Sequence, residues 1–182
     1  IEVPTVKYAM IDENIGYIRI TNFTPYTDDR VEDAVFDLQL RNYQALIIDV
    51  RNNPGGLLRS VIDTADLFLA GDTIVSTRSR IPNANETYMA EKDVLIPDEI
   101  PIIMLINKGS ASASEILAGA LRDNERAVLI GETTYGKASV QDVRDLGDVG
   151  FKLTTARYFT PSGSDIDKTG IEPDTAVAEP EL

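Results

Sequence analysis

The sequence PIIMLINKGSASASE, residues 101–115, decides the fold. Its first part, residues 101–106, is a continuous apolar run, which is typical of a parallel strand buried on both faces. Small and polar residues then lead into a helix whose inner face carries Ala113, Ile116, Leu117, Ala120 and Leu121. The segment therefore predicts a strand, a tight turn and a helix, with Ser112 at the turn.

The same pattern recurs on both sides of this segment. Residues 45–50 and 127–130 are further short apolar runs, and residues 15–20 are branched and apolar enough for a strand. Amphipathic helices follow at residues 27–38 and from Leu58 onward. Because strands alternate with helices, we expect an α/β domain with right-handed crossovers and a mainly parallel sheet flanked by helices.

The remaining sequence carries weaker signals and sets the size of the fold. Further strand-like stretches lie at residues 73–77, 87–89, 139–143 and 151–158. A chain of 182 residues suits one domain with a sizeable core, so we expect a single domain over residues 1–182. The Pro-rich, acidic residues 175–182 are expected to form a tail.

Charge and hydropathy exclude two classes of partner. Hydrophobic residues make up 43% of the chain and charged residues 26%, as in globular domains, and no apolar run approaches the length of a membrane-spanning helix. The formal net charge of −13 repels phosphate backbones and anionic lipids. We therefore expect no nucleic-acid partner and no membrane segment.

The absence of cysteine and histidine limits the chemistry further. Without cysteine there are no disulfides, thiolate nucleophiles or thiolate metal sites. Without histidine there is no Ser-His-Asp triad, so acid–base work near neutral pH must use a carboxylate, a tyrosine or a lysine. A carboxylate site for Mg²⁺ or Ca²⁺ is chemically allowed. No ordered spacing of Asp and Glu points to one, and we expect neither a metal nor another cofactor.

Ser112 is the first candidate for chemistry. A serine between a buried strand and a helix is held on a rigid scaffold, and the unpaired N–H groups of the helix N-terminus point where an oxyanion would form. A purely structural interpretation competes with this one. Ser112 and Glu115 have the Ser-x-x-Glu spacing of a capping box, and small residues are common in turns.

Two further segments contain candidate residues. In residues 51–56, RNNPGG, the two glycines can turn backbone N–H groups outward and supply a second oxyanion donor, although a simple tight turn explains them equally. Lys137 follows a glycine at the start of a strand-like stretch. In a regular strand Lys137, Ser139 and Gln141 project from one face, so the Gln141 amide can orient the lysine amine. Taken alone, Lys137 is interpreted as a solvated surface residue.

Together these segments resemble the carboxyl-terminal processing peptidases, tail-specific serine proteases that use a Ser-Lys dyad. Nearly the whole chain carries the resemblance, and its motifs occur in the family's order. They are residues 16–20 (GYIRI), 49–57 (DVRNNPGGL), 109–116 (GSASASEI) with 118–121 (AGAL), 135–137 (YGK), 153–158 (LTTARY) with 160–163 (TPSG), and 170–174 (GIEPD).

The resemblance assigns roles to single residues. It implies that Ser112, the middle serine of residues 110–114, is the nucleophile, that Lys137 is the general base, and that Gln141 orients the lysine. The N–H groups of Gly56 and Ala113 would form the oxyanion hole, whereas Ser110 and Ser114 are then structural. One departure from the family's pattern is Ala138, which stands where a glycine usually follows the lysine.

The mechanism implied by the resemblance requires a neutral amine. A free lysine side chain has a pKa near 10.4, so such a site must disfavour the ammonium form by burial among apolar side chains. The net negative charge of the chain acts in the opposite direction. We therefore expect no carboxylate in contact with the Lys137 amine.

The resemblance also implies the setting of the chain. It predicts a ClpP/crotonase-like core, and a PDZ domain that joins near residues 1–6, so that the chain is an isolated protease core. It predicts an extracytoplasmic protein, exported to the periplasm, cell wall or medium. The candidate partners are the C-termini of unfolded or flexible protein and peptide substrates, the protein's own PDZ domain and a second copy of the chain in a homo-oligomer.

Two other functions compete with a serine endopeptidase. The fold can serve as a non-catalytic module that binds peptides or apolar ligands. It can also support an acyl-CoA enzyme of the crotonase type, which builds its oxyanion hole from two backbone amides as well. Such an enzyme would need neither Ser112 nor Lys137, and the sequence has no basic cluster suited to the phosphates of CoA.

Overall fold

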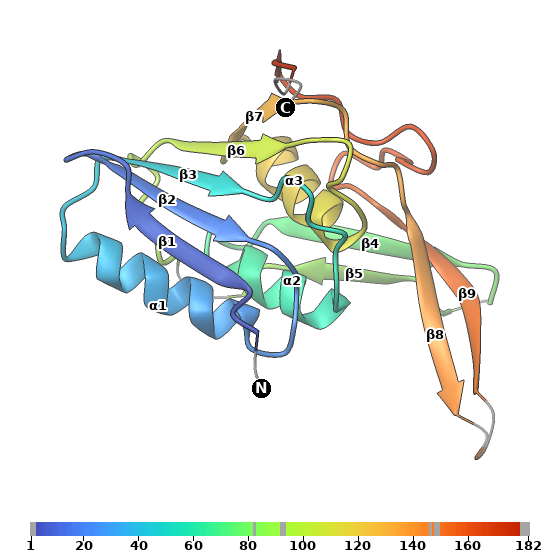
Figure 1. Cartoon of the computed structure of the whole chain (residues 1–182). Coiled ribbons are helices and arrows are strands. Elements are labelled where there is room, and N and C mark those ends of the chain that lie inside the picture. Colours follow the sequence, from blue (N-terminus) through green and yellow to red (C-terminus); the bar gives the residue numbers. More distant parts are fainter. Residues whose placement is uncertain (1–2, 82, 92–93, 146, 148–149, 179–182) are drawn as a thin grey trace.

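The computed structural model of the chain describes residues 3–81, 83–91, 94–145, 147 and 150–178. Helices and strands alternate along most of this length (Figure 1). In chain order the elements are β1 (Val6–Met10), β2 (Ile15–Ile20), α1 (Thr27–Gln39), β3 (Ala45–Asp49), α2 (Leu58–Asp66), β4 (Thr73–Ser79), β5 (Glu86–Met89), β6 (Ile102–Ile106), α3 (Ala113–Asp123), β7 (Val128–Gly131), β8 (Ser139–Asp145), β9 (Gly150–Phe159) and β10 (Thr175–Ala176).

The central sheet confirms the predicted mainly parallel architecture. Its six strands follow the order β1-β2-β3-β6-β7-β10, and only the β1–β2 pair is antiparallel. The apolar runs predicted as strands form its middle, where Ile48 of β3 lies opposite Met104 of β6 and both side chains are fully buried. Because parallel strands end at the same edge, the segments that follow β3 and β6 lie next to each other.

The three helices cover one face of this sheet. Their predicted inner faces are buried, as at Val31 and Leu38 of α1, Val61 of α2 and Leu117 of α3. Helix α3 packs against β7 of the central sheet on one side and against β4 on the other. The helices therefore form the middle layer between two sheets (Figure 1).

A second, four-stranded sheet was not expected from the sequence. It is antiparallel, in the order β5-β4-β9-β8, and lies across the helices. The stretches predicted as strands at residues 73–77, 87–89, 139–143 and 151–158 pair with one another rather than with the central sheet. The β8–β9 hairpin extends away from the body of the molecule (Figure 1), and β8 forms one edge of this sheet.

The strands at the two edges of the central sheet differ from those predicted. Strand β1 was missed because its middle residues, Lys7 to Ala9, are exposed and give no apolar run. Thr175 and Ala176, which were assigned to the tail, pair with Ile130 and Gly131 as strand β10. Residues 179–182 of the expected tail lie outside the described residues. No helix in the described ranges is long and apolar enough to cross a membrane.

Candidate active site

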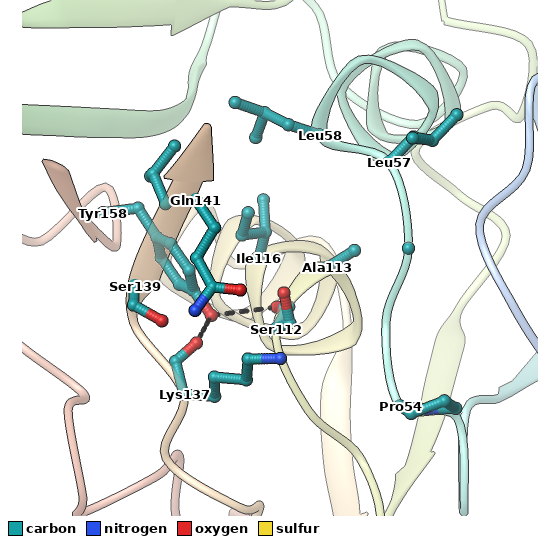
Figure 2. Close-up of a pocket in the computed structure, with 12 residues that line it drawn as sticks. Pro54, Leu57, Leu58, Ser112, Ala113, Ile116, Lys137, Ser139, Gln141 and Tyr158 are labelled. Atoms are coloured by element: carbon teal, nitrogen blue, oxygen red, sulfur yellow. Dashed lines mark hydrogen bonds between the residues drawn. The ribbon is translucent and has the colours of Figure 1, made fainter. Parts of the chain in front are cut away.

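A cavity of about 380 Å³ opens where the segments after β3 and β6 meet the start of β8. All five residues singled out from the sequence line it: Gly56, Ser112, Ala113, Lys137 and Gln141. Leu57, Leu58, Ile116 and Val140 form the apolar part of its wall, and Tyr158 lies beside Lys137 (Figure 2). The fold thus brings together residues that are up to 85 positions apart in the sequence, since 141 − 56 = 85.

Ser112 has a strained backbone at the N-terminus of α3. Its φ and ψ are 56° and −114°, a left-handed conformation that costs a non-glycine residue about 1–3 kcal/mol. The serines on either side are buried and hold the turn in place. The Ser110 hydroxyl donates to the Val50 carbonyl at 2.9 Å, and the Ser114 hydroxyl donates to the Asn53 carbonyl at 2.9 Å. Of the three serines, Ser112 is the one that lines the cavity.

The loop after β3 is anchored by Asp49, whose side chain is fully buried. Its carboxylate accepts hydrogen bonds from the Arg51 N–H at 2.9 Å, from the Tyr17 hydroxyl at 2.7 Å and from the Arg19 guanidinium at 2.7 Å. Burial alone would raise the pKa of Asp49, but the hydrogen bonds from Arg51, Tyr17 and Arg19 outweigh it, and the pKa is lowered. The loop therefore begins from a fixed ionised group.

Asn53 ties the same loop to the serine turn. Its side-chain amide donates to the Ile20 carbonyl at 3.0 Å, and its side-chain oxygen accepts the Gly55 N–H at 2.9 Å. Its backbone carbonyl accepts the Ala111 N–H at 3.0 Å. These contacts set the position of the two glycines relative to Ser112.

Both glycines of the loop have positive φ angles and tight surroundings. A Cβ on Gly55 (φ 106°) would lie 2.7 Å from the Ser112 Cβ, and one on Gly56 (φ 151°) would lie 2.1 Å from the Phe23 carbonyl oxygen. The Gly56 N–H donates to no other residue in the described ranges. The Ala113 N–H, at the first position of α3, also has no acceptor there. Both donors are therefore available to a ligand in the cavity.

Lys137 precedes β8, and its amine points toward Ser112 (Figure 2). The residue is half-buried, so its burial is less complete than the sequence analysis required. Within the part of the chain that the structure describes, its amine forms no ion pair and no hydrogen bond. Hydrogen bonding fixes the backbone of Lys137, whereas its amine has no partner among the described residues.

Gln141 lines the cavity together with Lys137 and Ser139, and its role in orienting the lysine amine stays a prediction. It is exposed, and no hydrogen bond joins it to the Lys137 amine among the described residues. The stretch from Lys137 to Gln141 is not a regular strand throughout. Strand β8 begins at Ser139, after the lysine, and the pairing with β9 shifts register between Val140 and Gln141.

Glu115 was interpreted from the sequence as a helix-capping residue only. Its side chain is fully buried, and its carboxylate accepts four hydrogen bonds. One oxygen, Oε2, accepts the Ser112 N–H at 2.8 Å and the Lys137 N–H at 2.9 Å. The Ser-x-x-Glu spacing indicated the first of these bonds. Nothing in the local sequence indicated the others, because they come from residues 19 to 22 positions further along the chain.

Tyr158 was also missed. It is 2% exposed, and its hydroxyl donates to the Ser112 carbonyl at 3.1 Å and to the Lys137 carbonyl. Burial raises the pKa of Tyr158, and the negative charge of Glu115 raises it further, so the hydroxyl keeps its proton. Among the described residues, no cluster of three or more carboxylates could hold a metal ion.

The chain has an α/β fold in which a serine, a lysine and two available backbone N–H groups line one cavity. Residues 14–177 match the family described as Peptidase family S41, and the chain belongs to this family. The resemblance noted in the sequence is therefore confirmed at the level of the family.

Named relatives agree with this classification. The chain is 46% identical over 185 residues to the carboxy-terminal-processing protease of Bartonella bacilliformis, covering 99% of this chain and 42% of the relative. It is 38% identical over 183 residues to the carboxy-terminal processing protease CtpA of Bacillus subtilis, covering 100% and 39%. Among solved structures, the photosystem II D1 C-terminal processing protease superposes with a TM-score of 0.86 at 31% identity, covering 98% and 49%. The chain thus spans less than half the length of each of these proteins.

Proposed function

We propose that this chain is the catalytic core of a serine endopeptidase that cleaves near the C-termini of unfolded or flexible proteins. In this proposal Ser112 is the nucleophile and Lys137 is the general base. The observation that carries it is the position of Ser112, strained at a helix N-terminus, in the same cavity as a lysine in a chain without histidine. In a chain without histidine, lysine is one of the few side chains that can serve as a general base.

The reaction would proceed through an acyl-enzyme. The neutral Lys137 amine takes the proton of the Ser112 hydroxyl while Oγ bonds to the scissile carbonyl carbon, and the carbonyl π electrons move to oxygen. The resulting ammonium then gives its proton to the departing amide nitrogen as the C–N bond breaks. A water molecule repeats the attack with Lys137 as base, which releases the acid and regenerates Ser112.

Two backbone donors would stabilise the oxyanion. The Ser112 N–H is occupied by Glu115, whereas the N–H groups of Gly56 and Ala113 both belong to the wall of the cavity and have free donor capacity in the described structure. Removal of one oxyanion donor typically costs about 3–4 kcal/mol in the transition state. Glycine at position 56 also lets the substrate backbone approach closely.

A bound peptide would favour the neutral amine. Lys137 is half-buried, and the wall beside it includes the apolar side chains of Ile116 and Leu58. A substrate that covers the cavity removes water from the amine and disfavours its charged form. Gln141, which is free in the described structure, could then turn toward the amine and accept from it or donate to it.

The substrate class and the cellular setting are parts of the same proposal. An extended peptide can add to the free edge of β8, which selects for disordered substrates, and the apolar wall suits an apolar side chain next to the cut. We further propose that the whole protein carries a PDZ domain, acts outside the cytoplasm and can form a homo-oligomer. A non-catalytic binding module and a crotonase-type enzyme are less consistent with a peptidase family match.

The proposal is tested with a fluorophosphonate probe, which phosphonylates an activated serine with loss of fluoride. We expect the wild-type chain to be labelled at Ser112, and both Ser112→Ala and Lys137→Ala to lose labelling. Labelling that persists in both variants contradicts the dyad. Loss in Ser112→Ala alone would support the nucleophile and reject Lys137 as base.

A further inference from the structure

Two buried side chains connect the backbone of Ser112 to the backbone of Lys137. On the N–H side, Glu115 Oε2 accepts from both residues, at 2.8 and 2.9 Å. On the carbonyl side, the Tyr158 hydroxyl shares its single proton between the carbonyls of both residues in a bifurcated hydrogen bond. The nucleophile and the base belong to different elements, so these bridges join the N-terminus of α3 to the loop that precedes β8.

The Glu115 carboxylate has no capacity left for chemistry. A carboxylate offers about four lone-pair sites. Oε2 accepts the two bonds already described, and Oε1 accepts the Thr134 hydroxyl at 2.6 Å and the Gly136 N–H at 2.7 Å. The Thr134 hydroxyl in turn accepts the Ile171 N–H at 2.7 Å, so its single proton is directed at the carboxylate. With its lone pairs filled, Glu115 cannot act as a second general base.

The same hydrogen bonds from Glu115 and Tyr158 hold the strained backbone of Ser112 in place. The left-handed conformation of Ser112 persists only if the surroundings over-determine it. Glu115 fixes its N–H and Tyr158 contacts its carbonyl, and the same two groups fix Lys137. A displacement of about 1 Å between reacting groups can reduce a rate by about 100-fold. The relative position of the two backbones therefore matters for the attack.

We propose that Glu115 and Tyr158 are positioning residues that hold Ser112 and Lys137 in register. The inference rests on the proposed Ser-Lys mechanism for its effect on activity. It assigns to Glu115 a role beyond helix capping, and to Tyr158 a role beyond filling the core.

The test uses Glu115→Gln and Tyr158→Phe in the whole chain. In Glu115→Gln, an NH₂ group replaces one oxygen and meets an N–H donor, whereas the side chain keeps its length. We expect the labelling rate of Ser112 by a fluorophosphonate, measured well below each melting temperature, to fall about 100-fold. In Tyr158→Phe the Glu115 bridge survives, and we expect a fall of about 10-fold.

Matched controls separate positioning from stability. Thr64→Val removes the buried hydrogen bond from Thr64 to the Ser60 carbonyl in α2, away from the cavity. Tyr43→Phe removes a buried hydroxyl that has no hydrogen-bond partner among the described residues. We expect Thr64→Val to lower the melting temperature without changing the labelling rate, and Tyr43→Phe to change neither. The double variant of Glu115 and Tyr158 should lose less than the product of the single losses, because both bridges hold one geometry.

A folded Glu115→Gln chain that is labelled at the wild-type rate would overturn the inference. So would a Thr64→Val chain that loses labelling in proportion to its stability. Crystal structures of the wild type and Glu115→Gln give a readout that needs no activity. We expect residues 133–138 to shift relative to α3 in the variant, and an unchanged loop contradicts the bridge. If Lys137→Ala is labelled normally, the dyad fails, and this displacement still decides the role of Glu115.

Discussion

Gly55 lies against the candidate nucleophile so closely that a Cβ at this position would be 2.7 Å from the Ser112 Cβ. The contact joins the loop after β3 to the turn after β6, and it leaves no room for any side chain. Glycine is thus required here by close approach as well as by its φ of 106°. The part of the site around Ser112 is built from two loops that meet because their strands are neighbours in a parallel sheet.

Gly55→Ala should therefore damage activity more than stability alone explains. The added methyl group must push the loop and the Ser112 turn apart, and Gly56 moves with the loop. We expect a loss of peptide cleavage of about 100-fold or more, measured with an unfolded protein substrate.

Gly71→Ala is the matched control for this variant. Gly71 also has a positive φ, 73°, but a Cβ there would meet nothing within 4 Å. We expect it to cost roughly 1 kcal/mol of stability and to leave cleavage unchanged. Equal activity losses in the two variants would show that backbone strain, rather than the contact with Ser112, is responsible.

Ser112→Gly should be more stable than the wild type although it is inactive. Glycine adopts the φ of 56° without the penalty that a Cβ imposes. We expect a gain of about 1 kcal/mol in the free energy of unfolding, measured by denaturant titration. Ser112→Ala, which keeps the Cβ, should show no such gain. If neither variant is stabilised, the turn is not strained.

Asp49→Asn should destabilise the chain in a pH-dependent way. The pKa of Asp49 is lower in the folded than in the unfolded chain, so its contribution is present above the unfolded pKa of about 3.9 and is lost as the pH falls through the folded value. We expect a loss of about 3 kcal/mol at pH 7, because the variant leaves Arg19 and Arg51 without their buried partner.

The measurement is the free energy of unfolding of wild type and Asp49→Asn at pH 7 and at pH 3. The difference between the two proteins should shrink at the lower pH, where the wild-type carboxylate begins to protonate. A difference that is the same at both pH values would mean that the charge of Asp49 does not stabilise the fold.

Local patterns in the sequence were sufficient to predict the central part of the fold. The strands β3 and β6 are continuous apolar runs, and the buried residues of each helix recur at helical spacing. The pattern of apolar residues alone therefore predicts these strands and helices. The loops that follow these strands had to meet at one edge of a parallel sheet. The assignment of Ser112, Gly56 and Ala113 to one site came from the resemblance to the carboxyl-terminal processing peptidases, and the three residues line one cavity in the structure.

The missed features depend on contacts that no local pattern contains. Strand β1 is a short edge strand whose apolar residues are interrupted by Lys7, and the antiparallel sheet depends on which weak strands pair. Tyr158 reaches the Ser112 carbonyl from 46 residues away. The register shift between Val140 and Gln141 is defined only by the pairing of β8 with β9. Such register and pairing information is not periodic in the sequence.

The most direct test is a crystal structure of the chain with a peptidyl phosphonate bonded to Ser112. We expect the Lys137 amine within roughly 2.6–3.2 Å of the Ser112 Oγ, and the phosphonyl oxygen at hydrogen-bond distance from the N–H groups of Gly56 and Ala113. An amine that points away from Oγ in the adduct, or an oxygen bound by neither N–H group, would contradict the assignment of Ser112 and Lys137 as a catalytic pair.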